Sequence, residues 1–262
     1  MRALSTAATG MAAQQLNVEV ISNNIANMNT VGFKRQRAEF QDLLYQDIER
    51  AGEQTSASGT VVPTGIQIGA GVKAGSVYRI TEQGSMTQTA NPLDLGVNGA
   101  GYFQVLMPDG TNAYTRAGNF ALNQDGQLVT PQGYLVQPQI TIPQGSTGIT
   151  ISPTGQVQAT PPGSSTPAVI GQLTLATFTN EAGLEAQGDN LFTETAASGN
   201  PVLNNPGSVG TGTLMQGYTE ASNVDAVTEI TALITAQRAY EMNSKVVNTA
   251  DQMLATTSQL KS

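Results

Sequence analysis

The sequence of 262 residues contains no cysteine, no histidine and no tryptophan. Without cysteine the chain can form neither a disulfide nor a thiolate metal site. Without histidine, the Ser-His and Cys-His catalytic pairs and the imidazole metal ligands are excluded as well. The sequence therefore predicts a protein that is not an enzyme of these classes and that holds no cofactor or metal.

Charged residues are also scarce, at 11% of the chain against about 25% in an ordinary globular protein. The hydrophobic content of 39% does not fit intrinsic disorder, which needs few apolar groups. The net charge of −8 makes nucleic acid and anionic membranes unsuitable partners. A surface poor in charge is typical of subunit interfaces, but a Gly- and Thr-rich extracellular β-protein has the same composition.

No apolar run reaches eighteen residues, so we expect a protein that is not inserted in a membrane. Residues 1–13 resemble a secretory signal only weakly, because Ser5, Thr6, Thr9 and Gly10 interrupt the apolar core. We expect this stretch to be a mature helix without a cleaved signal peptide. Export would then use another route.

Near the N-terminus, large apolar residues recur every seven positions. They are Leu4, Met11, Val18 and Ile25. This period places one seam along a helix and requires a helical partner. We predict a helix from about residue 3 to residue 28, marginal in isolation and ended by Gly32 in a left-handed conformation.

The C-terminal part repeats the same pattern and supplies the expected partner helix. Its series consists of Leu233, Tyr240, Val247 and Leu254, with Ile230, Ala236 and Ala250 alongside. Ser222 and Asn223 offer an N-cap. The predicted fold is therefore α+β and multidomain, with N- and C-terminal helices paired as a coiled coil that encloses a central all-β domain.

The central part, from about residue 66 to residue 206, carries alternating strand patterns such as residues 140–142, 149–151 and 173–178. Glycine turns separate them, for example at Gly99 and Gly126, which predicts antiparallel hairpins. We divide the chain into three parts. They are a coiled-coil domain (1–33 with 222–262), an extended connector (34–72 with 207–221) and the β domain (73–206).

Residues 33–50 fit either a short second helix or an extended arm. Lys34, Arg35 and Arg37 at its start are expected to form a solvated or salt-bridged face. Residues 51–65 have the composition of a linker or long loop. A loop of that length is uncommon unless it is functional or disordered.

Carboxylates are the one remaining catalytic possibility, as pairs that hydrolyse glycosides. The candidates in the β domain are Asp94, Asp109, Asp125 and Asp189. Asp109 and Asp125 each precede a glycine in an apparent turn, where aspartate serves the backbone. A secreted polysaccharide-acting enzyme is therefore the weaker alternative, and an adhesin lacks any recognisable ligand site.

Asparagine is concentrated around the end of the first helix. The cluster comprises Asn17, Asn23, Asn24, Asn27 and Asn29. Asparagine is a weak helix former, and in a helix seam it costs stability while it specifies register. We interpret the cluster as hydrogen bonding between helices of an assembly; fraying and capping of a helix end is the alternative.

The same residues resemble the rod and hook proteins that form the axis of the bacterial flagellum. Residues 23–34 read NNIANMNTVGFK and resemble the N-terminal rod signature. Residues 222–225 (SNVD) and 237–245 (QRAYEMNSK) resemble the C-terminal motif, and residues 101–105 with 113–118 resemble the shared β domain. The resemblance covers the whole chain and includes both termini.

Within that family, residues 35–46 and the chain length resemble the distal rod members. The following stretch, 45–65, is similar to a segment thought to keep the distal rod straight, and includes Tyr45, Gln46, Pro63 and Gly65. Hook members are generally longer, and proximal rod members diverge in this region. A hook or proximal-rod subunit is therefore the alternative within the family.

The resemblance implies a structural subunit of the distal rod, exported unfolded through the secretion channel of the flagellum. Subunits would polymerise helically into a straight hollow shaft that transmits torque to the hook and conducts exported subunits. The assembly residues would lie in the terminal helices, including Asn23, Asn24 and Asn27. Partners would be further copies of the chain, proximal rod proteins, the hook protein, the P and L rings and the export apparatus. The location would be the basal body, from the periplasm to the outer membrane.

Overall fold

The computed structural model describes residues 2–49, 64–163 and 166–259. The chain separates into two compact units. The helix-and-arm unit consists of Met1–Ile25, Gln36–Tyr78 and Asp225–Ser262. The β unit consists of Ala26–Arg35 and Arg79–Val224, so the chain passes between the units several times.

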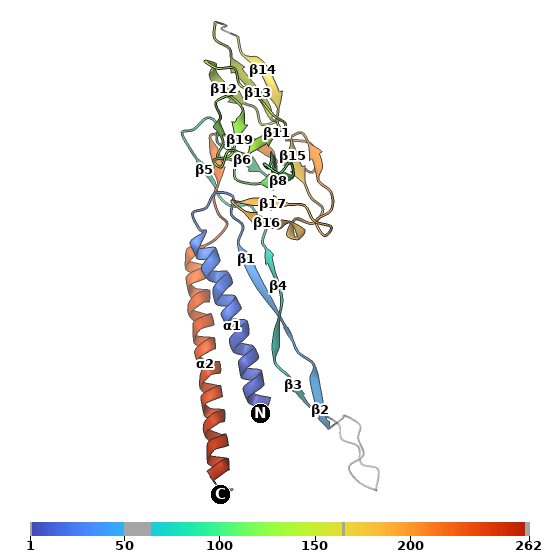
Figure 1. Cartoon of the computed structure of the whole chain (residues 1–262), viewed down its shortest axis with the longest axis vertical. Coiled ribbons are helices and arrows are strands. Elements are labelled where there is room, and N and C mark those ends of the chain that lie inside the picture. The colour runs from blue at the N-terminus through green and yellow to red at the C-terminus, as the bar shows by residue number, and fades with distance from the viewer. Residues whose placement is uncertain (1, 50–63, 164–165, 260–262) are drawn as a thin grey trace. The chain divides into compact units, whose positions relative to one another are not determined.

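Two long helices dominate the helix-and-arm unit, α1 (Arg2–Ala26) and α2 (Ala226–Gln259) (Figure 1). Both helices were expected near these positions, and α1 ends two residues earlier than predicted. The N-cap prediction was wrong by a few residues. Asp225, not Ser222 or Asn223, caps α2, because its Oδ1 accepts a hydrogen bond from the backbone N–H of Thr228 at 2.7 Å.

Two strand pairs form the arm of this unit. Strand β1 (Gln36–Asp42) pairs with β4 (Val72–Arg79), and β2 (Tyr45–Glu49) pairs antiparallel with β3 (Ile66–Gly69). Of the two possibilities for residues 33–50, the extended arm is therefore confirmed and the short helix is wrong. The strands form because partners from residues 66–79 satisfy their backbone groups.

The largest sheet of the β unit has seven strands. In spatial order they are β16 (Glu185–Gly188), β17 (Leu191–Thr193), β8 (Asn112–Thr115), β7 (Phe103–Leu106), β11 (Leu135–Gln137), β10 (Leu128–Val129) and β9 (Ala121–Leu122). Every pair in this sheet is antiparallel. Neighbours such as β7 with β8 and β16 with β17 are consecutive in the chain, whereas β17 with β8 and β11 with β7 are joined by long connections.

Smaller sheets complete the β unit. One has three strands: β12 (Thr147–Ile151), β13 (Gln156–Thr160) and β14 (Ala168–Gln172). The remaining pairs are β15 (Leu175–Thr177) with β18 (Val202–Asn204), β19 (Thr213–Gln216) with β6 (Leu95–Asn98), and β20 (Tyr218–Glu220) with β5 (Met86–Gln88). A short 3-10 helix spans Glu181–Gly183.

Glycines adopt positive φ at the turns that the sequence indicated. The φ angle is 110° at Gly99 and 77° at Gly126, a region that residues with a Cβ rarely adopt. The predicted strand at 140–142 is wrong, because only Thr141 forms an isolated bridge, with Gln127. Its apolar neighbours Ile140 and Ile142 are buried without belonging to a ladder.

A continuous apolar core fills the β unit. Leu95, Phe103, Leu173 and Leu175 have no solvent exposure, and Phe103 contacts Phe120 edge to face at a centroid distance of 5.0 Å. A second cluster contains Tyr102, Tyr114, Phe178 and Phe192. This core gives the β unit the buried apolar area that an independently stable domain requires.

Candidate functional site: the helix pair and a buried ion cluster

A hydrogen bond and a close approach, fourteen residues apart on each helix, join α1 and α2. The amide of Asn24 donates to Glu229 Oε2 at 3.1 Å, and a Cβ at Gly10 would lie 2.8 Å from the Asn243 side chain. Between them, Asn17 and Ala236 line one groove. From Gly10 through Asn17 to Asn24, α1 advances by seven residues at a time. The facing positions on α2, from Asn243 through Ala236 to Glu229, go back by seven each time, so the helices run antiparallel (Figure 1).

Asn24 joins three elements of this unit. Its side chain donates to the Gln36 carbonyl at 2.8 Å and accepts from the Gln36 N–H at 2.8 Å, besides its contact with Glu229. Asn24 and Glu229 are each 1% exposed. Because this buried amide forms hydrogen bonds through both its oxygen and its nitrogen, it specifies a single register between α1, β1 and α2.

The other asparagines of the predicted cluster have different positions. Asn23 is exposed and Asn27 is half-buried, with its Oδ1 accepting from the hydroxyl of Thr30 at 3.1 Å in the turn after α1. Asn17 is half-buried and lines the groove between the helices. Within the chain, Asn24 connects the two helices and Asn27 stabilises a helix end, and hydrogen bonding of these asparagines between helices of an assembly stays a prediction.

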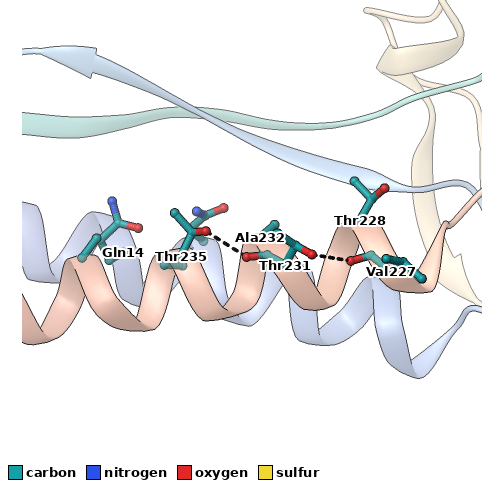
Figure 2. A pocket seen from close by; sticks show the side chains of 9 residues that line it. Gln14, Val227, Thr228, Thr231, Ala232 and Thr235 are labelled. Atoms are coloured by element: carbon teal, nitrogen blue, oxygen red, sulfur yellow. Dashed lines mark hydrogen bonds between the residues drawn. The ribbon is translucent and has the colours of Figure 1, made fainter.

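A groove of about 610 Å³ lies along the helix pair, and Figure 2 shows its lining. Gln14 lies on α1, whereas Thr231 and Thr235 lie on α2. The hydroxyl of Thr235 donates to the Thr231 carbonyl, and that of Thr231 donates to the Val227 carbonyl (Figure 2). Because these hydroxyls are satisfied within the helix, the groove offers methyl groups and small side chains for packing.

The predicted seam residues are not the most buried ones. Those that are half-buried are Leu4, Met11, Val18, Ile25, Leu233 and Val247, whereas Ile230, Tyr240 and Leu254 are 42–48% exposed. The fully buried apolar side chains of the helices are Ala7, Ala13, Val20, Ile21, Ala236 and Ala250. Sequence reasoning favoured large side chains, but the small residues at 236 and 250 carried the same heptad signal.

Large apolar side chains remain exposed along α2. They include Val227, Ile234, Met242, Val246 and Met253, with exposed fractions between 46% and 73%. Several large apolar side chains exposed along one helix favour an interaction site. The helices thus bury four alanines together with Val20 and Ile21, while α2 also displays several larger apolar residues.

The predicted rod-type segment lies partly in the arm. Tyr45 and Gln46 begin β2 and are exposed, and Gly65 directly precedes β3. Pro63 lies outside the described residues. Leu44 beside this segment is 87% exposed, so the arm also presents apolar side chains to its surroundings.

An ion cluster is buried in the β unit. Glu220, with no solvent exposure, accepts from Lys34 Nζ at 2.6 Å and from Arg116 Nε at 2.9 Å. Lys34 also donates to the Glu82 carbonyl, and Arg116 donates to the carbonyl of Gly101. We expected Lys34 on a solvated or salt-bridged face; it is salt-bridged but only 3% exposed, so the solvated alternative is wrong.

Backbone contacts around the cluster tie distant segments of the β unit together. Gly32 N–H donates to the Glu220 carbonyl at 2.8 Å, and Arg35 N–H donates to Asn223 Oδ1 at 2.7 Å. The Asn223 amide in turn donates to the Ile80 carbonyl. The segments that adjoin the boundaries between units, near residues 35, 79 and 224, are therefore joined inside the β unit.

Gly32 in this region has the conformation expected from the sequence, with φ at 70°. A Cβ there would also lie 2.7 Å from the backbone nitrogen of Ala117. Gly32 therefore serves both a left-handed turn and a close approach of two segments.

Burial shifts the pKa values of several side chains in the β unit. Desolvation lowers the pKa of Lys34, and the hydrogen bond and charge of Glu220 oppose this effect. Burial also raises the pKa of Tyr114 to about 12, with help from the neighbouring charge of Glu194. For Tyr102, burial raises the pKa and the Glu181 carboxylate adds to that shift.

Three of the four candidate catalytic aspartates, Asp109, Asp125 and Asp189, lie in turns, and Asp94 forms an isolated β-bridge with Asn119. Asp109 Oδ1 accepts from the hydroxyl and the N–H of Thr111, and this hydrogen bonding lowers the pKa of Asp109. Asp125 lies in a turn, as expected. Its backbone N–H donates a hydrogen bond to Asn123 Oδ1. Asp94 accepts from Asn91, and Asp189 has a positive φ of 51° in a turn beside a pocket of about 160 Å³.

Among the helices of the described part, none is both long and apolar enough to span a bilayer.

Comparison with known families assigns a class to this arrangement of terminal helices around a β unit. Residues 4–34 match the family described as flagella basal body rod protein, and residues 215–260 match the C-terminal family of the flagellar basal body rod FlgEFG proteins. Residues 96–159 match the D1 domain of the flagellar hook protein FlgE/F/G. The chain is thus of the class of flagellar rod and hook proteins.

Relatives that align with nearly the whole chain narrow this class to one family. The chain is 71% identical to the flagellar basal-body rod protein FlgG of Caulobacter vibrioides, over all of both chains. It is 54% identical to FlgG of Agrobacterium fabrum over 99% of each chain, and 40% identical to FlgG of Bacillus subtilis over 100% of this chain and 99% of the relative. The chain belongs to the FlgG family of flagellar basal-body rod proteins.

Proposed function

We propose that the chain is the structural subunit of the flagellar distal rod, polymerising helically into a straight hollow shaft. The shaft would transmit motor torque to the hook and conduct exported subunits. The observation that carries this proposal is the exposure of large apolar side chains along α2, combined with membership of the rod family. A helix pair that displays such residues reaches full burial only among further copies.

The proposed assembly gives each part of the chain a role. Residues 1–33 with 222–262 would form a coiled coil that lines the inside of the tube. Residues 34–72 with 207–221 would form the connector, and residues 73–206 the outer β domain. The antiparallel contacts of Asn24 with Glu229 and of Gly10 with Asn243 support the coiled coil, because they repeat at heptad spacing.

The proposed location is the basal body, from the periplasm to the outer membrane. The partners would be further copies of the chain, proximal rod proteins, the hook protein, the surrounding P and L rings and the export apparatus. Export would be in the unfolded state, without a cleaved signal peptide. The low content of charged residues supports extensive contact between subunits.

The test is polymerisation of the purified protein, followed by electron microscopy. Straight tubes are expected for a distal rod subunit, whereas curved, supercoiled tubes would indicate the alternative, a hook subunit. Deletion of residues 46–65 is expected to leave the β unit folded while the tubes bend. Tubes that stay straight after the deletion would remove the reason to prefer distal rod over hook.

A further inference from the structure

The helix pair carries a second groove, of about 360 Å³, with an acidic rim. Val18 of α1 and Tyr240 of α2 are its apolar lining residues. Glu19 and Glu241, both exposed, add a carboxylate from each helix. The groove therefore offers apolar surface flanked by two negative charges and no positive one.

A complementary surface lies elsewhere on α2. Arg238, Met242 and Lys245 are spaced i, i+4 and i+7, which places them on one face of the helix. All three are exposed, and Met242 is 61% exposed. This basic stripe presents an apolar side chain between two positive charges.

The charges of both surfaces are available to a partner. Across the described part of the chain, neither Arg238, Glu241 nor Lys245 forms an ion pair. Glu241 and Lys245 do not pair with each other, although the spacing i, i+4 allows it. Glu19 Oε1 accepts a hydrogen bond from the Gln15 amide at 3.1 Å, and the charges of Arg238, Glu241 and Lys245 remain open to contacts outside the chain.

We propose that the basic stripe of one copy docks into the acidic groove of the next copy. This inference rests on the proposed function and names a contact within the polymer. Met242 follows Tyr240 by two positions, or about 200° around the helix, so the apolar centres of stripe and groove face different directions, although Glu241 at the rim of the groove adjoins Lys245 of the stripe. A contact between two different faces is heterologous and propagates into an open filament. The charges would select the partner and its register.

The first test uses charge reversal in the full chain. Variant A carries Glu19→Lys and Glu241→Lys, and variant B carries Arg238→Glu and Lys245→Glu. Each variant alone places like charges in contact, so its critical concentration for polymerisation is expected to rise about tenfold. An equimolar mixture of A and B is expected to recover most of this loss, because each groove then meets a stripe of opposite charge.

Two outcomes overturn the proposal. If A and B each polymerise like the wild type, the two surfaces do not touch. If the mixture polymerises no better than either variant, the charges act within their own helix. A control with Asp125→Lys and Glu185→Lys changes the net charge as variant A does, on exposed residues of the β unit, and is expected to polymerise normally. Circular dichroism of each monomer checks that its helices and β unit are retained.

The second test uses the absence of natural cysteine. The variant Val18→Cys/Met242→Cys is expected to give a ladder of disulfide-linked oligomers when its polymers are oxidised. Each single-cysteine variant can give dimers at most. If the wild type forms tubes but the double variant forms no ladder, the docking is refuted and the rod function stands. Failure of the wild type to form any tube would contradict the proposed function, and the inference with it.

Discussion

The two units of this chain differ in where they keep their apolar residues. The β unit encloses Leu95, Phe103 and Leu175 completely, whereas the buried apolar residues of the helices are mostly alanines. Full burial of a leucine or phenylalanine contributes about 1.5–3 kcal/mol, and an alanine contributes much less. The β unit therefore has the means to fold alone, and the helix pair depends on further contacts.

The difference also concerns polar groups. The β unit buries an ion cluster in which Lys34, Glu220 and Arg116 satisfy one another. The helices keep Arg238, Glu241 and Lys245 exposed. The helix-and-arm unit also buries the hydrogen bond between Asn24 and Glu229, but it leaves these three charged side chains exposed.

Hydrogen exchange of the monomer would show the largest contrast. Amides in β7 and β8 are expected to exchange at least about 100-fold more slowly than amides in α1, because local opening of a poorly packed helix costs little free energy. Mass spectrometry of peptides from residues 2–26 and 103–115 measures this directly. Strong protection of residues 2–26 in a proven monomer would contradict the claim that α1 is less stable than the β unit. A fragment of residues 26–224 is the control and should retain the slow exchange of β7 and β8.

Loss of the Glu220 carboxylate is expected to be the most damaging point change in the β unit. Glu220→Ala leaves Lys34 and Arg116 buried without their counter-charge, which costs about 3–5 kcal/mol of unfolding free energy. Urea unfolding followed by tyrosine fluorescence gives this value. Glu185→Ala, on an exposed strand residue, is the matched control and should change stability by less than about 0.5 kcal/mol. Equal effects of the two changes would contradict the role of the cluster.

The same substitution made in each unit sharpens the comparison. Leu175→Ala removes a fully buried side chain and is expected to cost about 2–5 kcal/mol. Leu254→Ala removes a side chain that is 44% exposed, and should cost the monomer less than about 0.5 kcal/mol. Polymerisation should show the opposite order. For the same loss of monomer stability, Leu254→Ala should weaken polymerisation more than Leu175→Ala does. A monomer destabilised equally by both changes would mean that the helix pair has a core of its own.

Alkaline titration should give the smallest effect. Burial raises the pKa of Tyr114 to about 12, above the value of about 10 for an unfolded tyrosine. A group whose folded pKa is raised contributes stability that is complete below the unfolded pKa and is lost as pH rises through the folded one. The β unit should therefore weaken between about pH 10 and pH 12. Ultraviolet absorbance of tyrosinate should show a late ionisation step that Tyr114→Phe reduces.

Local signals explain what was predictable in this fold. Heptad patterns indicated both helices, and alternation with glycine turns indicated antiparallel strands, because these features depend on neighbouring residues. The turn at Gly32 was predictable for the same reason. The cap of α2 was misplaced, because Ser222, Asn223 and Asp225 all have capping side chains and only the observed helix start distinguishes them.

Contacts between distant residues explain what was missed. The spacing of apolar residues in 33–50 was compatible with helix or strand until the partner strands β3 and β4 were known. Lys34 and Glu220 are 186 positions apart, so no local pattern connects them. The turn positions of Asp109 and Asp125 were predictable because each precedes a glycine, whereas the hydrogen bond between Asp94 and Asn91 became known only from the structure.

The sequence by itself determined that two helices flank a β region, and its motifs carried the resemblance to rod and hook proteins. Only the tertiary structure decided which residues of the two helices meet, bringing Gly10 against Asn243 and Asn24 against Glu229. The physical reason is that close approach of two helices depends on side-chain size at the contact, whereas heptad spacing alone is satisfied by several faces. The larger side chains thereby remain outside, where further copies of the chain would reach them.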